Sequence, residues 1–597
     1  MSAAPAPGGP DIAAWPPLDQ VTAAHGPALL DWAADTSPER PRVCLVRGAR
    51  GSGKSRLLAW FLMGSPAHPR TVVHAAVLAE GLISDAAAWD VGRQLGYGPL
   101  SPARLLDRLL VDQRPLLLLV ADLHRAGRGP ADGPLARPAT LVRELLRPLL
   151  ELPGTRAVIE VGNAELFGAE TEGVPVETID LGATALGPVD GPARIDLAAQ
   201  LPRTADGRPL WDRAPGDVRQ RALDQALLAE DPGPAVRALI TDPGFLLHGS
   251  PVSLAACLAD DRVPAPPGLR ETWRLVAPLL SDTELAAADR AALLHTAALG
   301  ASPTLARYLL PLAEAHPLTG VWTRPGAPVT ALAQLPGPDG QLLAADPLGD
   351  LAVLDPTTGR SAGPAPVPPA STARPQGIAA HHERSLLLLT DAGALRPTGD
   401  DAGADFGHLA THHGRAALGS PDATPTALGQ CPDGATTVIG DAQGAVHVWQ
   451  LKDAQAAPLS RALHPAPVSA VACLAFPDAG RTLVMSAGMD GTVRLWETSA
   501  DPLPTPIAQR RALVTALAAA HTPHGPVLAV AWNDATLDLW DLAGSRLRSV
   551  PLLLPAAALA FSPGPRLTIG GPDGAYALAL NTARLWDATG TAPPEAP

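Results

Sequence analysis

The stretch that decides the fold is RVCLVRGARGSGKSRLL, residues 42–58. Its apolar part, residues 43–46, predicts a short buried β-strand. Three glycines then fall within residues 48–53, where they predict a tight turn, and a helical pattern begins at Lys54. The sequence therefore predicts a strand, a glycine-rich turn and a helix in direct succession.

The turn and the start of the helix spell G-x-x-x-x-G-K-S without a mismatch. This is the pattern of a phosphate-binding loop, in which glycines let the backbone curl until successive N–H groups point at phosphate oxygens. The N-terminus of the following helix adds a partial positive charge. Lys54 is expected to reach the β- and γ-phosphates, and Ser55 to ligate Mg²⁺. The residues predicted to bind the nucleotide are Gly48, Gly51, Ser52, Gly53, Lys54 and Ser55.

The alternative is a chance match in a glycine-rich chain. Only two of the 45 lysine and arginine residues are lysines, Lys54 and Lys452. One of these two lies inside the loop, and the loop has the expected strand before it and the expected helix after it. Both facts favour a nucleotide site over a chance match.

Length and composition restrict the class of protein. A chain of 597 residues is too long for one core and predicts about three or four domains. The formal charge of −14 argues against a dominant nucleic-acid or anionic-membrane surface. The longest apolar stretch, residues 552–561, contains a proline and is too short to span a bilayer. Four widely spaced cysteines predict neither a disulfide framework nor a zinc site, so we expect a reducing, cytoplasmic setting.

The nucleotide domain is predicted at residues 41–182. Five strands alternate with helices, which predicts a doubly wound parallel sheet whose ligand lies at the carboxyl ends of the strands. The predicted strands after the first are residues 71–78, 115–121, 156–161 and 176–181.

Two residues at strand ends are candidates for catalysis. Asp122 ends a continuously apolar strand, where we expect the carboxylate on the metal side of the nucleotide. Asn163 lies just past the next strand, where it would contact the γ-phosphate or the attacking water. A turn asparagine is the alternative for that position.

Two further regions flank this domain. Residues 1–40 predict a disordered tail followed by a leading helix, with too little chain for an effector enzyme. Residues 183–315 have helical apolar spacing and predict a helical bundle or a winged-helix-like domain, without a catalytic cluster. The adjacent histidines of the chain, at 381 and 382 and at 412 and 413, would point opposite ways on a strand. We therefore expect them in loops, not in a metal site.

The remaining region, residues 316–597, repeats a turn signal every 39–51 residues. A short alternating strand follows most of these turns, and four-stranded units of this period predict a β-propeller. We count six blades, and a seventh would lie in residues 361–427 or be completed by residues 321–322 and 585–586. The turn markers are Gly349, Gly393, Gly444, Gly491, Ala535 and Gly574.

Residues 468–497 and 514–541 closely resemble WD repeats. The order of phosphate-loop domain, helical domain and WD-type propeller resembles the bacterial STAND class of signalling ATPases, and the excess of arginine over lysine is typical of GC-rich bacterial genomes. The resemblance implies that ATP holds the molecule in one of two states. It also implies that the propeller binds a protein partner and that self-association follows.

The chain departs from that class at one point. Relatives commonly have a second acid before the aspartate at the end of the acidic strand, and here Ala121 takes its place. The resemblance therefore implies slow hydrolysis at most. Residues 249–251 resemble the G-x-P element that contacts adenine in such proteins, although a chance loop in a proline-rich chain is the alternative.

The leading hypothesis is a cytoplasmic ATP-binding signalling or scaffold switch. A motor-type ATPase that remodels a protein client is one alternative, and it would need a residue that positions the attacking water. A passive propeller scaffold with an inactive loop is the other, and the intact Lys54-Ser55 pair argues against it.

Overall fold

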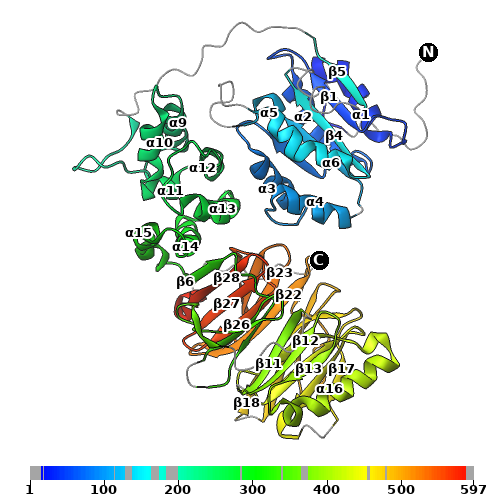
Figure 1. Cartoon of the computed structure of the whole chain (residues 1–597). Helices are drawn as coiled ribbons and strands as arrows, with labels where there is room; N and C mark the ends of the chain where they lie inside the picture. The colour runs from blue at the N-terminus through cyan, green and yellow to red at the C-terminus, as the bar shows by residue number, and fades with distance from the viewer. Residues whose placement is uncertain are drawn as a thin grey trace. The chain divides into compact units, whose positions relative to one another are not determined.

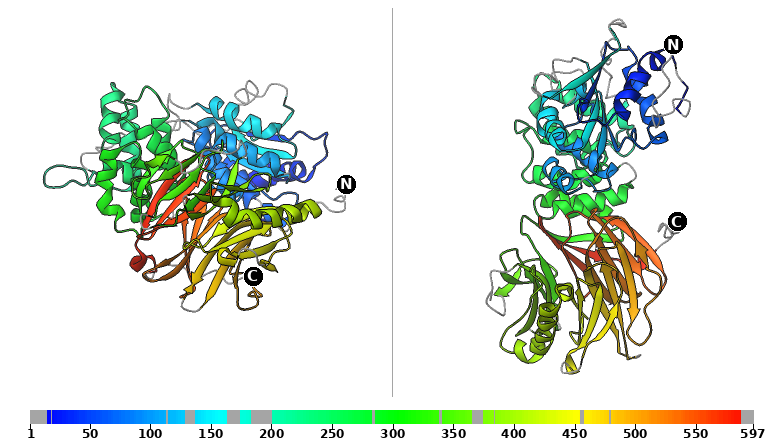
Figure 2. Two further views of the ribbon diagram at one scale, coloured as in Figure 1. Left: turned by 60° about the horizontal axis from the view of Figure 1, so that its bottom comes forward. Right: turned by 90° about the vertical axis from the view of Figure 1, so that its right-hand side faces the viewer.

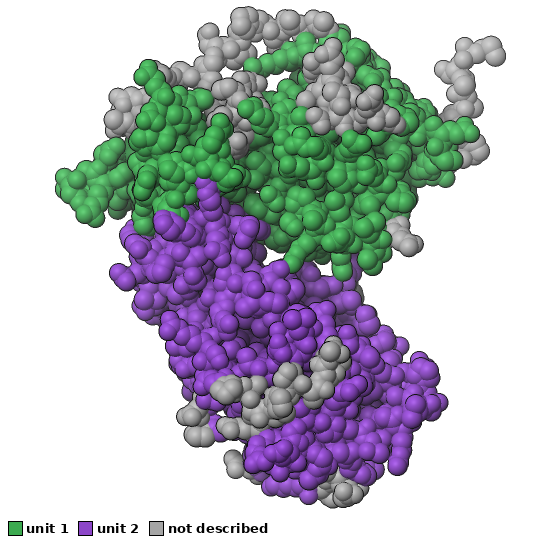
Figure 3. Space-filling view, viewed as in Figure 1, with its two compact units in different colours: residues 1–266, 280–283 green, residues 267–279, 284–597 purple. Residues whose placement is uncertain are grey.

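The computed structural model describes residues 15–17, 19–112, 114–127, 137–162, 174–182, 200–282, 285–337, 340–364, 374–382, 384–453, 457–477 and 480–586. The chain divides into two compact units, coloured separately in Figure 3. The first comprises residues 1–266 and 280–283, and the second comprises residues 267–279 and 284–597. The division falls inside the helical middle region, which therefore contributes helices to both units.

A five-stranded parallel sheet forms the centre of the N-terminal region, as the sequence predicts (Figure 1). The strand order is β2-β3-β4-β1-β5, so that β4 lies between the strand that precedes the glycine loop and the strand that ends at Asp122. The strands are β1 (Val43–Arg47), β2 (Ala75–Leu78), β3 (Leu116–Ala121), β4 (Thr155–Val161) and β5 (Val176–Asp180).

Both faces of the sheet are covered by helices, which explains why its strands are continuously apolar. Val43 and Leu45 of β1 belong to the core on one face, whereas Cys44 and Val46 belong to the core on the other. The second core includes side chains of α1 and α2, and the first includes those of α3, α4 and α6. The helices are α1 (Gln20–Ala34), α2 (Lys54–Gly64), α3 (Ser84–Gln94), α4 (Pro102–Val111), α5 (Pro138–Leu141) and α6 (Arg147–Glu151), with a π-helical turn at Val142–Leu146.

The middle region is helical. Among its described residues, 200–282 and 285–315, the one β-type pairing is an isolated bridge between Arg203 and Pro209. Its helices are α9 (Gly216–Leu227), α10 (Pro232–Ile240), α11 (Pro243–His248), α12 (Pro251–Leu258), α13 (Leu269–Leu280), α14 (Ala287–Ala298) and α15 (Pro303–Ala313).

The C-terminal region is a β-propeller in which six blades are described. The ring is closed by β6, which precedes the first blade in the chain and pairs with β28 of the last blade. The blades are β7 (Ala331–Gln334), β8 (Leu342–Ala345), β9 (Leu351–Leu354) and β10 (Ser361–Pro364); β11 (Pro375–His382), β12 (Ser385–Thr390) and β13 (Leu395–Thr398); β14 (Pro425–Gln430), β15 (Thr436–Asp441), β16 (Ala445–Gln450) and β17 (Leu459–Ala462); β18 (Val468–Phe476), β19 (Arg481–Gly488), β20 (Thr492–Glu497) and β21 (Ala508–Gln509); β22 (Val514–Thr522), β23 (Gly525–Trp532), β24 (Thr536–Asp541) and β25 (Arg546–Pro551); and β26 (Ala558–Ser562), β27 (Arg566–Gly571) and β28 (Gly574–Leu580) with β6 (Leu318–Pro325).

The region that was a candidate for a seventh blade instead holds a three-stranded second blade and a long helix, α16 (Ala402–Gly419). This helix packs on β12 and β13 and is drawn in yellow-green (Figures 1 and 2). Its buried side chains, Ala402, Phe406, Leu409 and His413, recur at helical spacing and explain why the segment does not form a strand. Residues 321–322 do close the ring, but they lie in β6 and complete the sixth blade by pairing with β28, not a seventh blade. Leu585 lies in a short helix, α17 (Thr582–Leu585), and not in a strand.

All six predicted turn markers have positive φ angles, which places them in tight turns between strands. The four cysteines are buried and free. In the described part of the chain, no helix is both long and apolar enough to cross a membrane.

Candidate functional site

The glycine loop connects the end of β1 to the start of α2. Gly53 is the N-cap of α2 and has a left-handed backbone conformation, with a φ angle of 101°. A Cβ atom at Gly48 would lie 2.5 Å from the Ser52 hydroxyl, so only glycine fits there without a shift of the serine. These two positions explain the need for glycine in a turn this tight.

The Lys54 ammonium is buried against the loop itself. Its Nζ donates hydrogen bonds to the backbone carbonyls of Gly48 at 2.8 Å and Ala49 at 3.1 Å. The Glu160 carboxylate of β4 lies 3.9 Å from Nζ, which is an ion pair but too long for a hydrogen bond. Lys54 is only 7% exposed and therefore belongs to the interior of the loop.

Two hydroxyl groups differ in their surroundings. The Ser52 Oγ is a buried atom without a hydrogen-bond partner among the described residues. Ser55, the second residue of α2, is exposed. Buried hydroxyls are almost always hydrogen-bonded in proteins, so the unpartnered Ser52 indicates a place where an external acceptor fits.

Asp122 lies at the carboxyl end of β3, as predicted. Its φ angle is 51°, which is a left-handed conformation that aspartate and asparagine tolerate better than most residues. Its backbone N–H donates to the Glu160 carboxylate at 3.4 Å. The structure thus brings Asp122, Lys54 and Glu160 together at the carboxyl ends of neighbouring strands.

Glu160 is the residue that the sequence predictions missed. The Glu160 residue is 2% exposed. The preceding residue, Ile159, pairs with Val120 of β3, so the parallel register places Glu160 opposite Ala121. Burial raises the pKa of the Glu160 carboxyl, the charge of Asp122 raises it further, and Lys54 lowers it. The available signal was a single acid inside the apolar strand at residues 157–161.

Other predicted positions are less informative. Asn163 lies outside the described residues, so its predicted contact with the γ-phosphate stays a prediction. His124 was not a predicted site residue; it lies two residues after Asp122, and its ring packs against Gly162, just past β4. Residues 249–251 connect the end of α11 to the start of α12, where the Ser250 hydroxyl accepts a hydrogen bond from the backbone N–H of Ser253.

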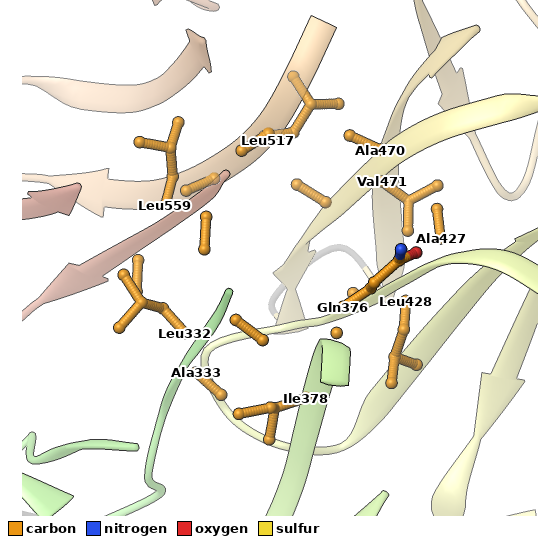
Figure 4. A pocket seen from close by; sticks show the side chains of 18 of the residues that line it. Leu332, Ala333, Gln376, Ile378, Ala427, Leu428, Ala470, Val471, Leu517 and Leu559 are labelled. Carbon is orange, nitrogen blue, oxygen red and sulfur yellow. The ribbon is translucent and has the colours of Figure 1, made fainter. Parts of the chain in front are cut away.

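The propeller has a second candidate surface along its axis. A cavity of about 430 Å³ is lined by the first strand of each blade (Figure 4). The labelled side chains around it are mostly small or aliphatic, with Gln376 as the polar exception. We find no cluster of potential catalytic groups in this lining.

The adjacent histidines correct one expectation. His412 and His413 lie in α16 rather than in a loop, and His413 is 1% exposed and accepts a hydrogen bond from the Trp449 indole at 3.1 Å. His381 and His382 end β11, and both approach Asp405 of α16. Side chains do not alternate between the two faces of the sheet there, because a β-bulge at residues 380–382 of β11 interrupts the pairing of β11 with β12.

Comparison with known proteins finds one repeat in the chain that is similar to a known family. A sequence model described as "WD domain, G-beta repeat" matches residues 461–497, which include most of the fourth blade. No curated protein matches the chain. Among solved structures, the crystal structure of the computationally designed Ika8 protein (crystal packing No. 1 in P63) is 18% identical and covers 42% of this chain and 70% of its own. Its TM-score is 0.26, which is too low to support a conclusion.

The C-terminal region is therefore a WD-type β-propeller, supported by both the repeat match and the six blades. A WD propeller suggests protein–protein interaction or scaffolding, because its blades present a rigid face with variable loops.

Proposed function

We propose that the chain is an ATP-dependent signalling scaffold, in which nucleotide bound at the glycine loop controls recognition of a protein partner by the propeller. The observation that carries this proposal is the surroundings of Lys54. Its ammonium makes two hydrogen bonds to neutral carbonyls and has a carboxylate 3.9 Å away. An ammonium has three N–H donors, and a buried one is best stabilised by an anion in direct contact.

A triphosphate supplies that anion. Its β- and γ-oxygens would replace the carbonyls of Gly48 and Ala49 as partners of Lys54, and the unpartnered Ser52 hydroxyl would donate to a phosphate oxygen. Mg²⁺ accompanies the nucleotide, with Ser55 and Asp122 as its proposed protein ligands. Magnesium usually keeps several waters and takes only one or two such ligands, which suits this small set.

Hydrolysis is proposed to be slow. Position 121, where relatives commonly have a second acid, is an alanine, so no acid precedes Asp122 in the strand. The Glu160 carboxylate on the neighbouring strand is the remaining candidate for orienting a water, and Asn163 is the proposed contact to the γ-phosphate. Burial and the charge of Asp122 raise the pKa of the Glu160 carboxyl, which strengthens its carboxylate as a base, so the proposal of slow hydrolysis rests on the alanine at position 121.

The first experiment tests nucleotide binding. Isothermal titration of the full chain with ATP and Mg²⁺ is expected to give one site, and Lys54→Ala is expected to weaken it about 10- to 100-fold, the value of a charge-assisted contact. Lys452→Ala is the matched control, because Lys452 is the only other lysine and is exposed. Equal affinity in both variants would reject the loop as the site.

The second experiment tests the switch. A propeller partner captured with the full chain should be recovered in different amounts in ADP and in a non-hydrolysable ATP analogue. A typical coupling of about 1–3 kcal/mol would change partner affinity roughly 5–150-fold. Light scattering on the same samples reports self-association. Identical recovery and mass in both nucleotides would leave a passive scaffold.

A motor-type ATPase is the competing function. It requires turnover toward the upper end of the usual enzyme range of about 1–1000 per second. The proposal for a switch expects turnover well below that range, so one steady-state rate measurement on the full chain separates the two.

A further inference from the structure

Three potential metal ligands meet at the edge of the second blade. The Asp405 Oδ2 lies 3.1 Å from the His381 Nδ1 and 3.6 Å from the His382 Nε2. The three ligand atoms all lie within 4.8 Å of one another. We propose that His381, His382 and Asp405 bind a zinc ion, at a site separate from the nucleotide loop.

The fold explains how two consecutive histidines reach one carboxylate. On a regular strand, neighbouring side chains point to opposite faces. The pairing between β11 and β12 shifts between Ala380 and His382, so the strand is bulged where the histidines lie. Bulges redirect side chains and occur frequently beside functional sites. Asp405 comes from the first turn of α16, which packs on the same blade.

Unpartnered polar atoms gather at this position. The Nδ1 of His381, the Oδ2 of Asp405 and the Oγ of Ser385 are all buried and face one another, but no well-aligned hydrogen bond joins them. Ser385 is completely buried. The His381 and Asp405 atoms are close enough for a hydrogen bond but are not aligned for one. Such groups are rare in folded proteins and indicate an unassigned ion or water.

The spacing and the donor types favour zinc. Zinc bonds of about 2.0–2.2 Å in a tetrahedral arrangement place the ligand atoms about 3.3–3.5 Å apart, close to both measured separations. Imidazole nitrogens suit zinc and its transition-metal neighbours, whereas magnesium and calcium prefer oxygen. Asp401 is the proposed fourth ligand after a rotation of its side chain, because its Oδ2 lies 3.9 Å from the His382 Nε2 but outside the group formed by the other three ligand atoms.

One existing contact must change when the metal binds. The backbone N–H of Arg384 donates to the Nδ1 of His382 at 3.2 Å, which places the proton of a neutral ring on Nε2. Coordination through Nε2 requires that proton to move to Nδ1, so the Arg384 N–H must turn to water. Because this contact is exposed, water can take the place of the His382 Nδ1 as the acceptor for the Arg384 N–H at little cost in free energy.

The proposed role is structural. The second blade has three described strands where the others have four, and α16 packs against it. A zinc ion would tie the β11–β12 hairpin to the first turn of this helix. Closed tetrahedral sites of this kind contribute directly to folding free energy.

The test is zinc binding by the full chain, purified without a histidine tag and without nucleotide. Competition against a chromophoric chelator is expected to give one equivalent of Zn²⁺. Replacing His381 and His382 together by alanine, or Asp405→Asn alone, is expected to weaken binding at least about tenfold. Co²⁺ in place of Zn²⁺ should give visible absorption bands that are lost in the same variants.

The controls remove equal numbers of histidines elsewhere. The double replacement of His521 and His524 by alanine should leave zinc binding unchanged. The double replacement of His408 and His412 tests the other plausible donors, which are four residues apart on α16. Circular dichroism, measured with a chelator present to remove zinc, verifies that each variant is folded. If the double histidine variant is not folded, Asp405→Asn, which is the mildest change, serves as the test. No zinc uptake by the parent chain, or uptake unchanged by loss of His381 and His382, would overturn the proposal.

Discussion

Two basic side chains are buried in different regions of the molecule: Lys54 of α2, beside the N-terminal sheet, and His413 of α16, in the propeller. Their surroundings are opposite in character. Lys54 keeps carbonyl oxygens and a carboxylate around its ammonium. His413 accepts a hydrogen bond from Trp449 through Nε2, so its ring is neutral in the folded state. Burial, together with the neighbouring His447 and His412, lowers the pKa of His413 to about 3. One region therefore buries a cation beside polar and acidic groups, whereas the other buries a basic ring in its neutral form.

The difference gives the two regions opposite responses to acid. His413 has a lowered pKa, so the unfolded chain binds its proton first and stability falls as the pH drops below about 6.5. Glu160 has a raised pKa, so the folded chain binds its proton first. The stabilisation of the folded state by protonated Glu160 is complete below the pKa of the unfolded chain, about 4.3. It is lost as the pH rises through the higher pKa of the folded chain.

The largest expected effect concerns His413. Between pH 7 and pH 4 this residue alone should cost the propeller about 3 kcal/mol of unfolding free energy. His413→Gln keeps an acceptor for the Trp449 indole but does not titrate, so its stability should depend less steeply on pH. Scanning calorimetry of both proteins across this range gives the difference. Parallel pH profiles would show that His413 is not a buried neutral acceptor.

A smaller effect of opposite sign is expected at Glu160. At pH 8, without nucleotide, Glu160→Gln should stabilise the N-terminal unit by about 1 kcal/mol, because it removes a buried carboxylate. The gain should disappear near pH 4, where the parent carboxyl is protonated.

Glu177→Gln is the matched control for this prediction. Glu177 lies on β5 of the same sheet and pairs with Arg40 at 2.7 Å, so its replacement should destabilise the sheet. Chemical denaturation at both pH values measures the two variants. Destabilisation by Glu160→Gln at pH 8 would mean that the ion pair with Lys54 outweighs the cost of burial.

The comparison also separates what the sequence could predict from what it could not. The glycine loop could be predicted because its parts are contiguous, and the strand that precedes it is apolar on both faces. Glu160 could not be assigned to the same site, because its position opposite Ala121 depends on β4 lying between β1 and β3. That strand order is a property of the sheet and has no local signature.

The propeller shows the same limit. Its repeat period and turn residues predict the blades, since each hairpin is a local structure. The helix at Ala402–Gly419 breaks the period and was missed, although its buried residues follow helical spacing. The convergence of His381 and His382 on Asp405 depends on a bulge and on that helix. Neither is visible in the strand pattern alone.

The smallest expected effect concerns the backbone, where the two regions also differ. The glycine loop places Gly53 at its left-handed position, whereas the turn of the fifth blade places Ala535 in that conformation with a φ angle of 65°. A side chain there costs about 1–2 kcal/mol, and the extra freedom of glycine in the unfolded chain offsets about 0.5–1 kcal/mol. Ala535→Gly should therefore stabilise the propeller by about 0.5–1 kcal/mol.

Ala543→Gly is the matched control, because Ala543 lies in the next turn of the same blade and has no positive φ angle. Ala543→Gly should lower the free energy of unfolding by a few tenths of a kcal/mol or more, because glycine has more conformational freedom in the unfolded chain. Chemical denaturation of both variants beside the parent resolves the signs. If both substitutions change the free energy of unfolding in the same direction and by the same amount, Ala535 is not strained by its left-handed conformation. The turns of the propeller would then be as free of backbone strain as the glycine loop.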